Sequence, residues 1–542
     1  MLKIIPKPSS IKELDGVFVL EDKISAFGDI SSDILLELTN ILLPIVGVSA
    51  VLKTEYEENG ICFVKDDAVA EEGYTILIKE DGIKISAKDD RGFFYALMTI
   101  YQMLNQYGRK LPHILIEDYP RFKYRSFMLD VGRYFYSVQD VKHFIDIMAV
   151  LKINTFHIHL TEDQGWRVQI DKYPLLTEQG SKRRKTNFNC IPHGGFYTKE
   201  DIKHIVEYAH KNYIAVIPEI DMPGHMVAAI SCYKHLGCFD RKLEVATHWG
   251  VKHDILCAGK DSTLEFVKDV LTEVIEMFPD GYIHIGGDEA NKTRWKICPN
   301  CQAKIKELGL KNEDEVQSVF MNDVAKFIES KGYKAIIWNE TEEDKYLSKS
   351  VLWNFYMYGE GDEKKNVPNL NKLFADEINS GRKCINVQSN AYYYDLPYHD
   401  ISLKQAYEYE PMIEGIKKEC EGNMIGVECD LWTEYVKNMK VASKKLFPRM
   451  FAMAESSWSD SKDKNYDEFV ERLENPKEIV ESITGYKTTS VKDANPNKAK
   501  AWFEKVWFER RQLHWQGLHN LIDDNNVRLK AKRDSKKIKN NK

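Results

Sequence analysis

The chain alternates short apolar runs with segments of helical spacing, and the rhythm of this alternation changes near residue 120. Before that point, the runs at 74–79 and 83–87 have the pattern of strands, and residues 92–106 have the apolar spacing of a helix. The dipeptide Tyr119-Pro120 then interrupts the pattern, because proline favours a turn or a break. We therefore predict a small α+β domain over residues 1–120.

After residue 124, short apolar segments alternate with helices in the order expected for βα units and a parallel sheet. Eight βα units indicate a closed (β/α)8 barrel over residues 121–460, an α/β fold of the TIM-barrel type. The surplus length falls between strands, in loops at the C-terminal face of the barrel. The predicted strands are 126–131, 155–160, 215–220, 282–286, 335–338, 351–355, 384–388 and 424–429.

The carboxyl-terminal part is predicted to be a helical extension over residues 461–526, followed by a basic tail. An amphipathic segment at 466–473 should pack on the barrel, and 499–521 has helical spacing. Residues 527–542 are rich in Lys, Arg and Asn and contain few apolar residues, so we predict a disordered tail. Nucleic-acid binding by this tail is the less favoured alternative.

Composition and charge narrow the class of partner. The 542 residues are 43% hydrophobic and carry a formal net charge of -7, which suits a globular protein and gives no basic field for nucleic acid. The amino terminus lacks a signal-peptide pattern, and no run approaches the roughly 20 apolar residues of a membrane span. We expect a cytoplasmic protein with ten reduced cysteines and no nucleic-acid or membrane partner; the sequence gives no indication of its oligomeric state.

Polar and aromatic residues follow the predicted barrel strands, at the face where such barrels carry their chemistry. One carboxylate in this position more often caps the next helix than takes part in catalysis. A whole ring of charged and aromatic side chains is costly unless a ligand uses it, and so indicates a binding site. The ring comprises Arg133, Glu162, Asp221, His225, Asp288, Glu289, Trp338, Glu340, Trp353, Asp395, Trp432 and Glu434.

The adjacent carboxylates Asp288 and Glu289 are the sharpest feature of this ring. Neighbours in an unbroken strand point to opposite faces, but the preceding glycines Gly286 and Gly287 let the backbone bend. We predict that the strand ends before the pair and that both side chains face one cavity. Because two close carboxylates repel each other, we expect a raised pKa for Glu289 as general acid, while Asp288 stays ionised.

Three tryptophans, Trp338, Trp353 and Trp432, follow three different strands. A purely structural place in the core is an equally good interpretation of each one alone, since tryptophan is mostly buried. Together with the acids, they suggest apolar walls on which a sugar ring would pack.

Four longer motifs resemble the family 20 glycoside hydrolases, the β-N-acetylhexosaminidases. They are 159–167 (HLTEDQGWR), 218–225 (PEIDMPGH), 283–290 (IHIGGDEA) and 426–434 (GVECDLWTE). The motifs stand in order across the predicted barrel, and the amino-terminal module is similar to the domain that precedes the barrel in this family. The resemblance covers residues 1 to about 485.

The resemblance implies an exo-acting retaining glycosidase that removes terminal β-linked N-acetylglucosamine or N-acetylgalactosamine from an oligosaccharide or glycoconjugate, without cofactor or metal. In this mechanism the acetamido oxygen of the substrate attacks its own anomeric carbon and forms an oxazolinium intermediate. By resemblance, Glu289 protonates the leaving oxygen and later activates water. Asp288 orients the acetamido group and stabilises the charge on its nitrogen, and Tyr393 donates a hydrogen bond to its oxygen.

The resemblance also implies substrate-binding and supporting residues. Trp338, Trp353 and Trp432 would enclose the acetamido group and the sugar face, and Arg133, Asp395 and Glu434 would hold ring hydroxyls. Glu162, Asp221 and His225 would form the network that supports the acid. The family has Asp where Glu162 stands, so the extra methylene puts the contact with His225 in question.

Two other classes of protein were weighed. The first is a metal-dependent hydrolase. In that interpretation His157 and His159, which lie on one face of a strand end, bind zinc together with His225 and Asp288. Loss of activity with a chelator and its recovery with zinc would favour that class. A sugar sensor without catalysis would keep the tryptophans and lose the acid, but the sequence retains the candidate catalytic residues.

The pair Cys298-x-x-Cys301 has the spacing of a zinc knuckle. No second cysteine pair stands nearby in the sequence to complete four ligands. We therefore predict a loop turn with two free thiols.

Overall fold

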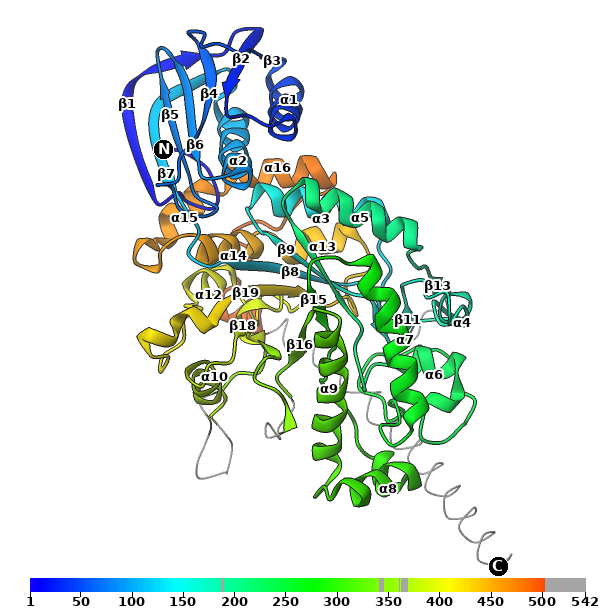
Figure 1. Ribbon diagram of the computed structural model, residues 1–542. Helices are drawn as coiled ribbons and strands as arrows, with labels where there is room; N and C mark the ends of the chain where they lie inside the picture. Colours follow the sequence, from blue (N-terminus) through cyan, green and yellow to red (C-terminus); the bar gives the residue numbers. More distant parts are fainter. Residues whose placement is uncertain (187–189, 341–345, 360, 362–368, 503–542) are drawn as a thin grey trace, which may run out of the picture.

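The computed structural model describes residues 1–186, 190–340, 346–359, 361 and 369–502. Within these residues the chain forms an amino-terminal α+β unit and a closed barrel, as predicted (Figure 1). Residues 503–542 lie outside the described part, and with them most of the predicted helix 499–521 and all of the tail 527–542. In the described residues, no helix has the length and hydrophobicity needed to span a membrane.

The amino-terminal unit is a seven-stranded sheet with helices α1 and α2 on one face (Figure 1). The strand order is β1-β7-β5-β6-β4-β2-β3. Helix α2 is largely buried because it lies between this sheet and helices α3 and α16 of the other unit. The bounds are β1 Ser10–Val19, β2 Lys23–Gly28, α1 Ser32–Val46, β3 Ser49–Leu52, β4 Gly60–Lys65, β5 Tyr74–Lys79, β6 Gly82–Ala87, α2 Asp90–Tyr107 and β7 Lys110–Asp118.

Eight parallel strands close the barrel in the order β14-β15-β16-β17-β18-β19-β8-β9. All eight predicted strands are present, and none departs from its predicted bounds by more than two residues. The long apolar runs arise because these strands are buried from both sides. The bounds are β8 Tyr124–Asp130, β9 Thr155–His159, β14 Ala215–Glu219, β15 Tyr282–His284, β16 Lys334–Trp338, β17 Leu352–Phe355, β18 Cys384–Asn386 and β19 Met424–Leu431.

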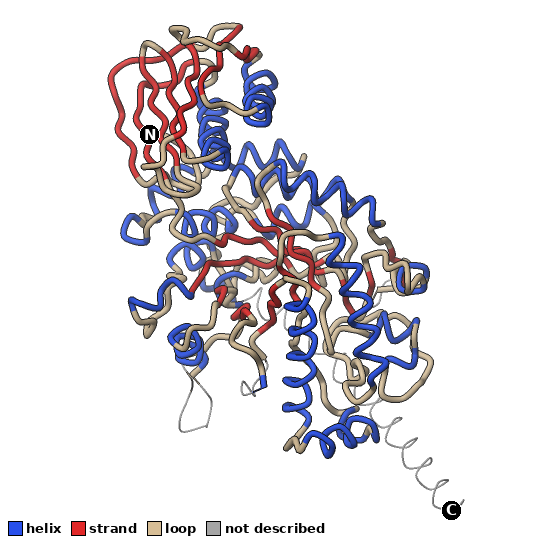
Figure 2. The backbone as a smooth tube through the Cα atoms, viewed as in Figure 1, coloured by secondary structure: helices blue, strands red, loops and turns tan. Residues whose placement is uncertain are grey.

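Helices surround the barrel strands, and short elements fill the loops at the C-terminal ends of the strands (Figure 2). The longer helices are α3 Val138–Val150, α5 Lys199–Lys211, α7 Asp261–Met277, α9 Glu313–Ser330, α10 Leu370–Asn379, α13 Met439–Leu446 and α14 Arg449–Trp458. The loops contain β10 Thr161–Glu162, β11 Gly165–Trp166, α4 Leu175–Glu178, β12 Lys182–Arg183, β13 His193–Gly194, α6 Val227–Cys232, η1 Lys234–Leu236, η2 Trp295–Ile297, α8 Pro299–Leu308 and α11 Ser389–Tyr392. Helix α12, Leu403–Glu408, packs on α14, and η5, Lys418–Asn423, directly precedes β19.

The predicted amphipathic segment at 466–473 packs on the barrel as helix α15, Tyr466–Arg472. Its buried face meets α12, where the ring of Phe469 stacks on that of Tyr407 at 4.3 Å between centroids. The 3-10 helix η6, Ser461–Asp463, precedes it, and α16, Glu474–Thr484, follows it.

A buried ion pair joins the two units. Nζ of Lys152, at the end of α3, lies 2.9 Å from Oδ2 of Asp118, the last residue of β7. The indole nitrogen of Trp458 in α14 donates a second hydrogen bond to Asp118 at 2.8 Å. Because one continuous hydrophobic core runs through both units, the sheet is part of the same packed body as the barrel.

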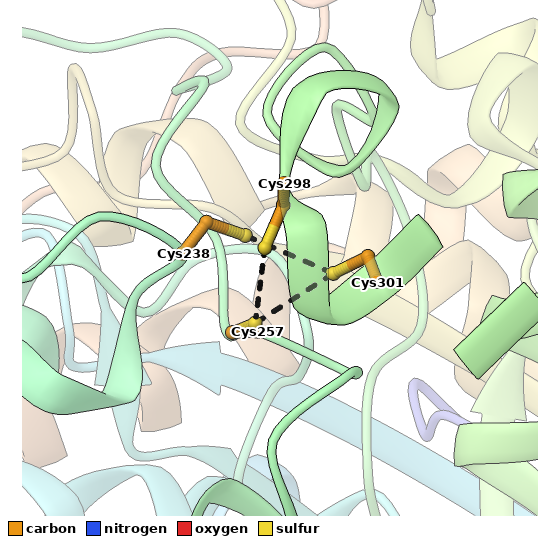
Figure 3. A group of neighbouring side chains, drawn as sticks. All are labelled: Cys238, Cys257, Cys298 and Cys301. Carbon is orange, nitrogen blue, oxygen red and sulfur yellow. Dashed lines mark hydrogen bonds between the residues drawn. The ribbon is translucent and has the colours of Figure 1, made fainter. Parts of the chain in front are cut away.

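The prediction of a simple loop turn at Cys298 and Cys301 is wrong. Cys298 is the N-cap residue of helix α8 and Cys301 lies in its first turn, with both side chains buried. Cys238 and Cys257, far away in sequence, lie against them in the fold (Figure 3). The second pair of cysteines was missed because it comes from a different loop.

Candidate active site

The backbone bends at the glycines that precede the two candidate catalytic carboxylates. Strand β15 ends at His284, and Gly286 and Gly287 then adopt φ values of 64° and 106°. A Cβ atom on Gly286 would overlap the carboxylate of Asp221, so this position has no room for a side chain. The strand therefore ends before the pair, as predicted.

Asp288 and Glu289 both approach the imidazole of His225. Nε2 of His225 lies 3.7 Å from Oδ2 of Asp288 and 3.5 Å from Oε2 of Glu289. The Asp288 side chain is 13% exposed, whereas that of Glu289 is 44% exposed. The two carboxylates thus lie side by side at the barrel mouth, with Glu289 on the outer side, where a leaving group could reach it.

The surroundings of Asp288 do not simply favour its ionised form. Burial raises the pKa of Asp288 to about 7, and the nearby carboxylates of Glu340 and Glu289 add to the rise against the opposing effect of His225. Asp288 therefore ionises less readily than an exposed aspartate. A positive charge placed beside Asp288 would draw the equilibrium towards its ionised form.

The longer side chain of Glu162 still reaches His225. Oε1 of Glu162 lies 3.0 Å from Nδ1 of His225, and it also forms an ion pair with Nη2 of Arg133 at 2.6 Å. Burial alone would lower the pKa of His225, but the carboxylates of Glu162, Asp221 and Asp288 raise it well above its usual value. His225 is therefore held as a cation between Glu162 and the catalytic pair.

Two further histidines extend this alternation of imidazole and carboxylate into the barrel. His159 lies between Glu162 and Glu219, at 3.4 Å and 2.6 Å, and His157 lies between Glu219 and Glu428, at 3.1 Å from each. Despite burial, the carboxylates raise the pKa of His157 to about 9 and that of His159 to about 10. Among the described residues, His157, His159, His225 and Asp288 do not come together as one group of possible ligands, so these four do not form the zinc site of the alternative hydrolase.

The predicted hydroxyl-binding residues gather on the opposite side of the site. The guanidinium of Arg133 stands 4.9 Å over the ring of Trp432 and has Nη2 3.9 Å from Oε1 of Glu434. Burial, together with the charge of Glu434, raises the pKa of Asp395 to about 7. The Tyr393 ring lies 6.0 Å from that of Trp432. These five residues from the ends of different strands therefore line one surface.

Trp338 lies at the base of the site. Its indole nitrogen donates a hydrogen bond to Oε1 of Glu219 at 2.8 Å, and its ring lies 5.8 Å from that of Trp432. The two tryptophans therefore form one apolar wall, and the hydrogen bond fixes the orientation of Trp338.

The prediction that Trp353 belongs to this wall is wrong. Asn354, its neighbour in β17, faces the barrel interior and donates to Glu428 at 2.6 Å. Trp353 faces the helical layer, is 2% exposed, and lies under the guanidinium of Arg382 at 4.5 Å. Alternation along the strand therefore places it outside the site.

Tyr356 and Glu340 are site residues whose roles were not predicted. Tyr356 follows the same alternation as Asn354, and its ring stacks on that of Tyr393 at 6.1 Å and 12°. Its hydroxyl donates a hydrogen bond to Glu340, which in turn accepts the backbone N–H of Glu289 at 2.6 Å. Counting alternate positions from Leu352 would have found Tyr356.

Comparisons with known proteins identify the family to which this fold belongs. Residues 122–461 match the catalytic domain of glycosyl hydrolase family 20, and residues 1–119 match domain 2 of the same family. A beta-hexosaminidase of Porphyromonas gingivalis is 36% identical over 498 residues, which are 88% of this chain and 62% of that protein. This chain therefore spans less than two thirds of that relative's length.

Solved structures of beta-hexosaminidases are also similar to this chain. A beta-N-acetylhexosaminidase of Bacteroides fragilis aligns with a TM-score of 0.79 and 31% identity, covering 92% of this chain and 99% of that one. A mutant Streptomyces plicatus beta-hexosaminidase in complex with the product GlcNAc aligns with a TM-score of 0.78 and 27% identity, covering 91% and 97%. The fold and site are thus those of a glycoside hydrolase. The chain belongs to glycosyl hydrolase family 20, and the predicted family, fold and enzyme class are confirmed.

Proposed function

We propose that the protein removes terminal β-linked N-acetylglucosamine or N-acetylgalactosamine from glycans, with retention of configuration. The observation that carries this proposal is the pair Asp288 and Glu289, both within 3.7 Å of His225 where β15 ends. The named activity of the Porphyromonas and Bacteroides relatives, and the GlcNAc bound to the Streptomyces one, support the substrate class.

The first step replaces the glycosidic bond with a bond inside the sugar. The acetamido oxygen of the substrate attacks its own anomeric carbon while the bond to the leaving oxygen breaks. Glu289 gives its proton to that oxygen, and Asp288 accepts a hydrogen bond from the acetamido N–H, where positive charge develops. Because the substrate supplies the nucleophile, the protein needs only a proton donor and a carboxylate that orients the amide.

The second step reverses these roles. Glu289, now ionised, takes a proton from water as the water oxygen attacks the anomeric carbon and the oxazolinium ring opens. Two inversions at one carbon give net retention. Tyr393 donates a hydrogen bond to the acetamido oxygen during both steps. Trp338, Trp432 and Tyr356 enclose the acetamido group, while Arg133, Asp395 and Glu434 bind ring hydroxyls.

Parallel hydrolysis of three aryl glycosides tests the proposal. The N-acetylglucosaminide and N-acetylgalactosaminide should be cleaved, whereas the glucoside should not, because it lacks the attacking amide. Protein with Glu289→Gln, purified in the same way, controls for contaminating activity. Equal cleavage of the glucoside would overturn the mechanism.

An analogue of the intermediate gives an independent test. A thiazoline that resembles the oxazolinium ring should bind at least about 100-fold more tightly than N-acetylglucosamine, as transition-state analogues do. Isothermal titration measures both affinities. Similar affinities would argue against participation of the acetamido group.

A further inference from the structure

Four cysteines from two loops converge (Figure 3), in a hydrophobic cluster that also contains Ala290, the neighbour of Glu289. Cys238 follows η1 and Cys257 precedes α7, whereas Cys298 and Cys301 begin α8 in the loop after β15. The Sγ–Sγ distances are 3.9 Å for Cys238 and Cys301, 3.7 Å for Cys257 and Cys298, and 3.6 Å for Cys257 and Cys301. All four sulfurs lie within 4.8 Å of one another.

These distances match the edges of a tetrahedron around a metal ion. Zinc binds thiolate sulfur at about 2.3 Å, which places the sulfurs of a tetrahedral site about 3.8 Å apart. A disulfide requires about 2.05 Å between its sulfurs, and all ten cysteines are free thiols in the structure. The spacing therefore favours coordination of one ion over two cross-links.

The cysteines belong to a small hydrophobic cluster that is separate from the main core. Cys257, Cys298 and Cys301 are buried and Cys238 is half-buried. A cluster this small buries little apolar surface, so a bound ion would supply much of the free energy that orders it. The other buried members are Ile255, Ala290, Trp295, Leu310 and Val316.

The local backbone also suits thiolate ligands. Cys298 is the N-cap residue of helix α8 and Cys301 lies in its first turn, where the backbone N–H groups have no partner within the helix. The positive end of the helix dipole stabilises thiolates at this position. A side chain on Gly259 would overlap the backbone of Asn300 and Cys301, so the two loops touch here.

We propose that Cys238, Cys257, Cys298 and Cys301 bind one Zn²⁺ ion in a closed structural site. Four protein ligands leave no open position for water or substrate, so the ion holds the loops together and takes no part in hydrolysis. This site revises the expectation from the sequence that the protein binds no metal.

The same ion would position the catalytic loops. Leu256, beside the cluster, donates its backbone N–H to the carbonyl of Pro223 at 2.9 Å, two residues before His225. Ala290, next to Glu289, packs in the cysteine cluster. This positioning role rests on the proposed function, whereas metal binding itself does not.

Metal analysis of the whole chain tests the proposal. Protein purified without chelators or metal-affinity resin should contain about one zinc per chain, as measured by inductively coupled plasma mass spectrometry. The control Cys62→Ser, which changes a cysteine outside the cluster, should keep that zinc, and Cys298→Ser with Cys301→Ser should lose at least about nine-tenths of it. Wild-type protein without metal, or with about one iron per chain, would overturn the assignment.

A second measurement uses the wild-type protein alone, so it stands even if the variant does not fold. Protein produced in cobalt medium should show the intense thiolate-to-cobalt absorption of a tetrahedral four-sulfur site, and its absence would overturn the proposal. Alkylation after unfolding without reductant should modify all ten cysteines. Six modified cysteines, ten minus four, would reveal two disulfides instead. Neither result depends on a substrate, so failure here is distinct from failure of the proposed glycosidase activity.

Discussion

Asp288 and Glu289 are neighbours in sequence with different surroundings. Asp288 is half-buried beside His225, and its pKa is raised to about 7, whereas Glu289 is far more exposed. In the proposed mechanism, the less exposed carboxylate orients the amide and the more exposed acid protonates the leaving group. The division of roles therefore follows from which side of the bend each residue occupies.

Glu289→Gln should lower kcat by about 100-fold to 10,000-fold on substrates with poor leaving groups, because an amide cannot donate the proton. Binding of the thiazoline should change little. The exposed Glu276 on α7 provides a matched control, and Glu276→Gln should leave kcat unchanged. Kinetics with a dinitrophenyl leaving group should show a much smaller loss, since that group departs without protonation. An equal loss for both leaving groups would contradict the role of general acid.

The raised pKa of Asp288 predicts a pH dependence. If the ionised form is the active one, kcat/KM should fall as the pH drops below about 7 and Asp288 gains a proton. Glu340→Gln removes a negative charge that raises this pKa, so the fall should move to lower pH. Profiles of kcat/KM for both proteins, measured with an aryl substrate, check the shift. An unmoved profile, or one shifted to higher pH, would rule out this assignment.

The sequence predicted individual residues best where local chemistry decides the outcome. The two glycines before the catalytic pair are a local signal, and the structure bears out the bend that they imply. Trp353 was misplaced because a shift of one position in a strand moves a side chain to the other face, and its segment contains several aromatic residues. Tyr356 is the residue that the correct register brings into the site.

At the scale of elements, the bend after β15 depends on Gly286. Gly286→Ala would place a methyl group against Asp221 and would also strain a backbone with φ of 64°. Gly332→Ala is a matched control, because Gly332 has φ of 84° but open space around it. The control should lose about 1 kcal/mol of stability and keep its activity. Gly286→Ala should lose more stability and most of its kcat/KM, as measured by denaturant unfolding and kinetics. Equal losses of stability and of kcat/KM in the two variants would show that backbone strain alone matters and that the contact with Asp221 does not.

The barrel strands were predictable as elements because each is a continuous apolar run between helical segments. The two-stranded ribbons β10-β11 and β12-β13 were not predicted, since each strand has only two residues and shows no periodicity. The cysteine cluster was missed for a related reason. Its members come from two loops, and only the fold brings them together.

At the scale of the whole molecule, the ion pair between Lys152 and Asp118 ties the sheet unit to the barrel. Lys152→Met would leave the buried carboxylate without its cation, and should cost about 3–5 kcal/mol of unfolding free energy. Adding Asp118→Asn should restore part of that loss, because the stranded charge is then removed. Denaturant unfolding measures both changes. Lys372→Met, which breaks an exposed pair with Asp376, should have little effect. A similar loss in this control would show that the buried pair has no special role.

The docking of the two units could not be predicted from the sequence. Lys152 and Asp118 lie 34 residues apart in the chain, and neither has a local pattern that indicates a partner.

The domain boundary near residue 120, the cytoplasmic location and the lack of a nucleic-acid partner stay predictions. They concern boundaries and partners that the fold alone does not test.

The cysteine cluster bears on how metal dependence in this enzyme would be interpreted. Inactivation by EDTA and rescue by zinc usually place the ion at the scissile bond. At the proposed zinc site the four cysteines lie next to the loops of His225 and Glu289, so removal of the ion would disorder those loops in some molecules and leave the chemistry of the others intact. Active-site titration would then show fewer competent molecules, each with unchanged turnover. Zinc supply or oxidative stress would set how much of the enzyme works, while its catalytic rate stayed fixed.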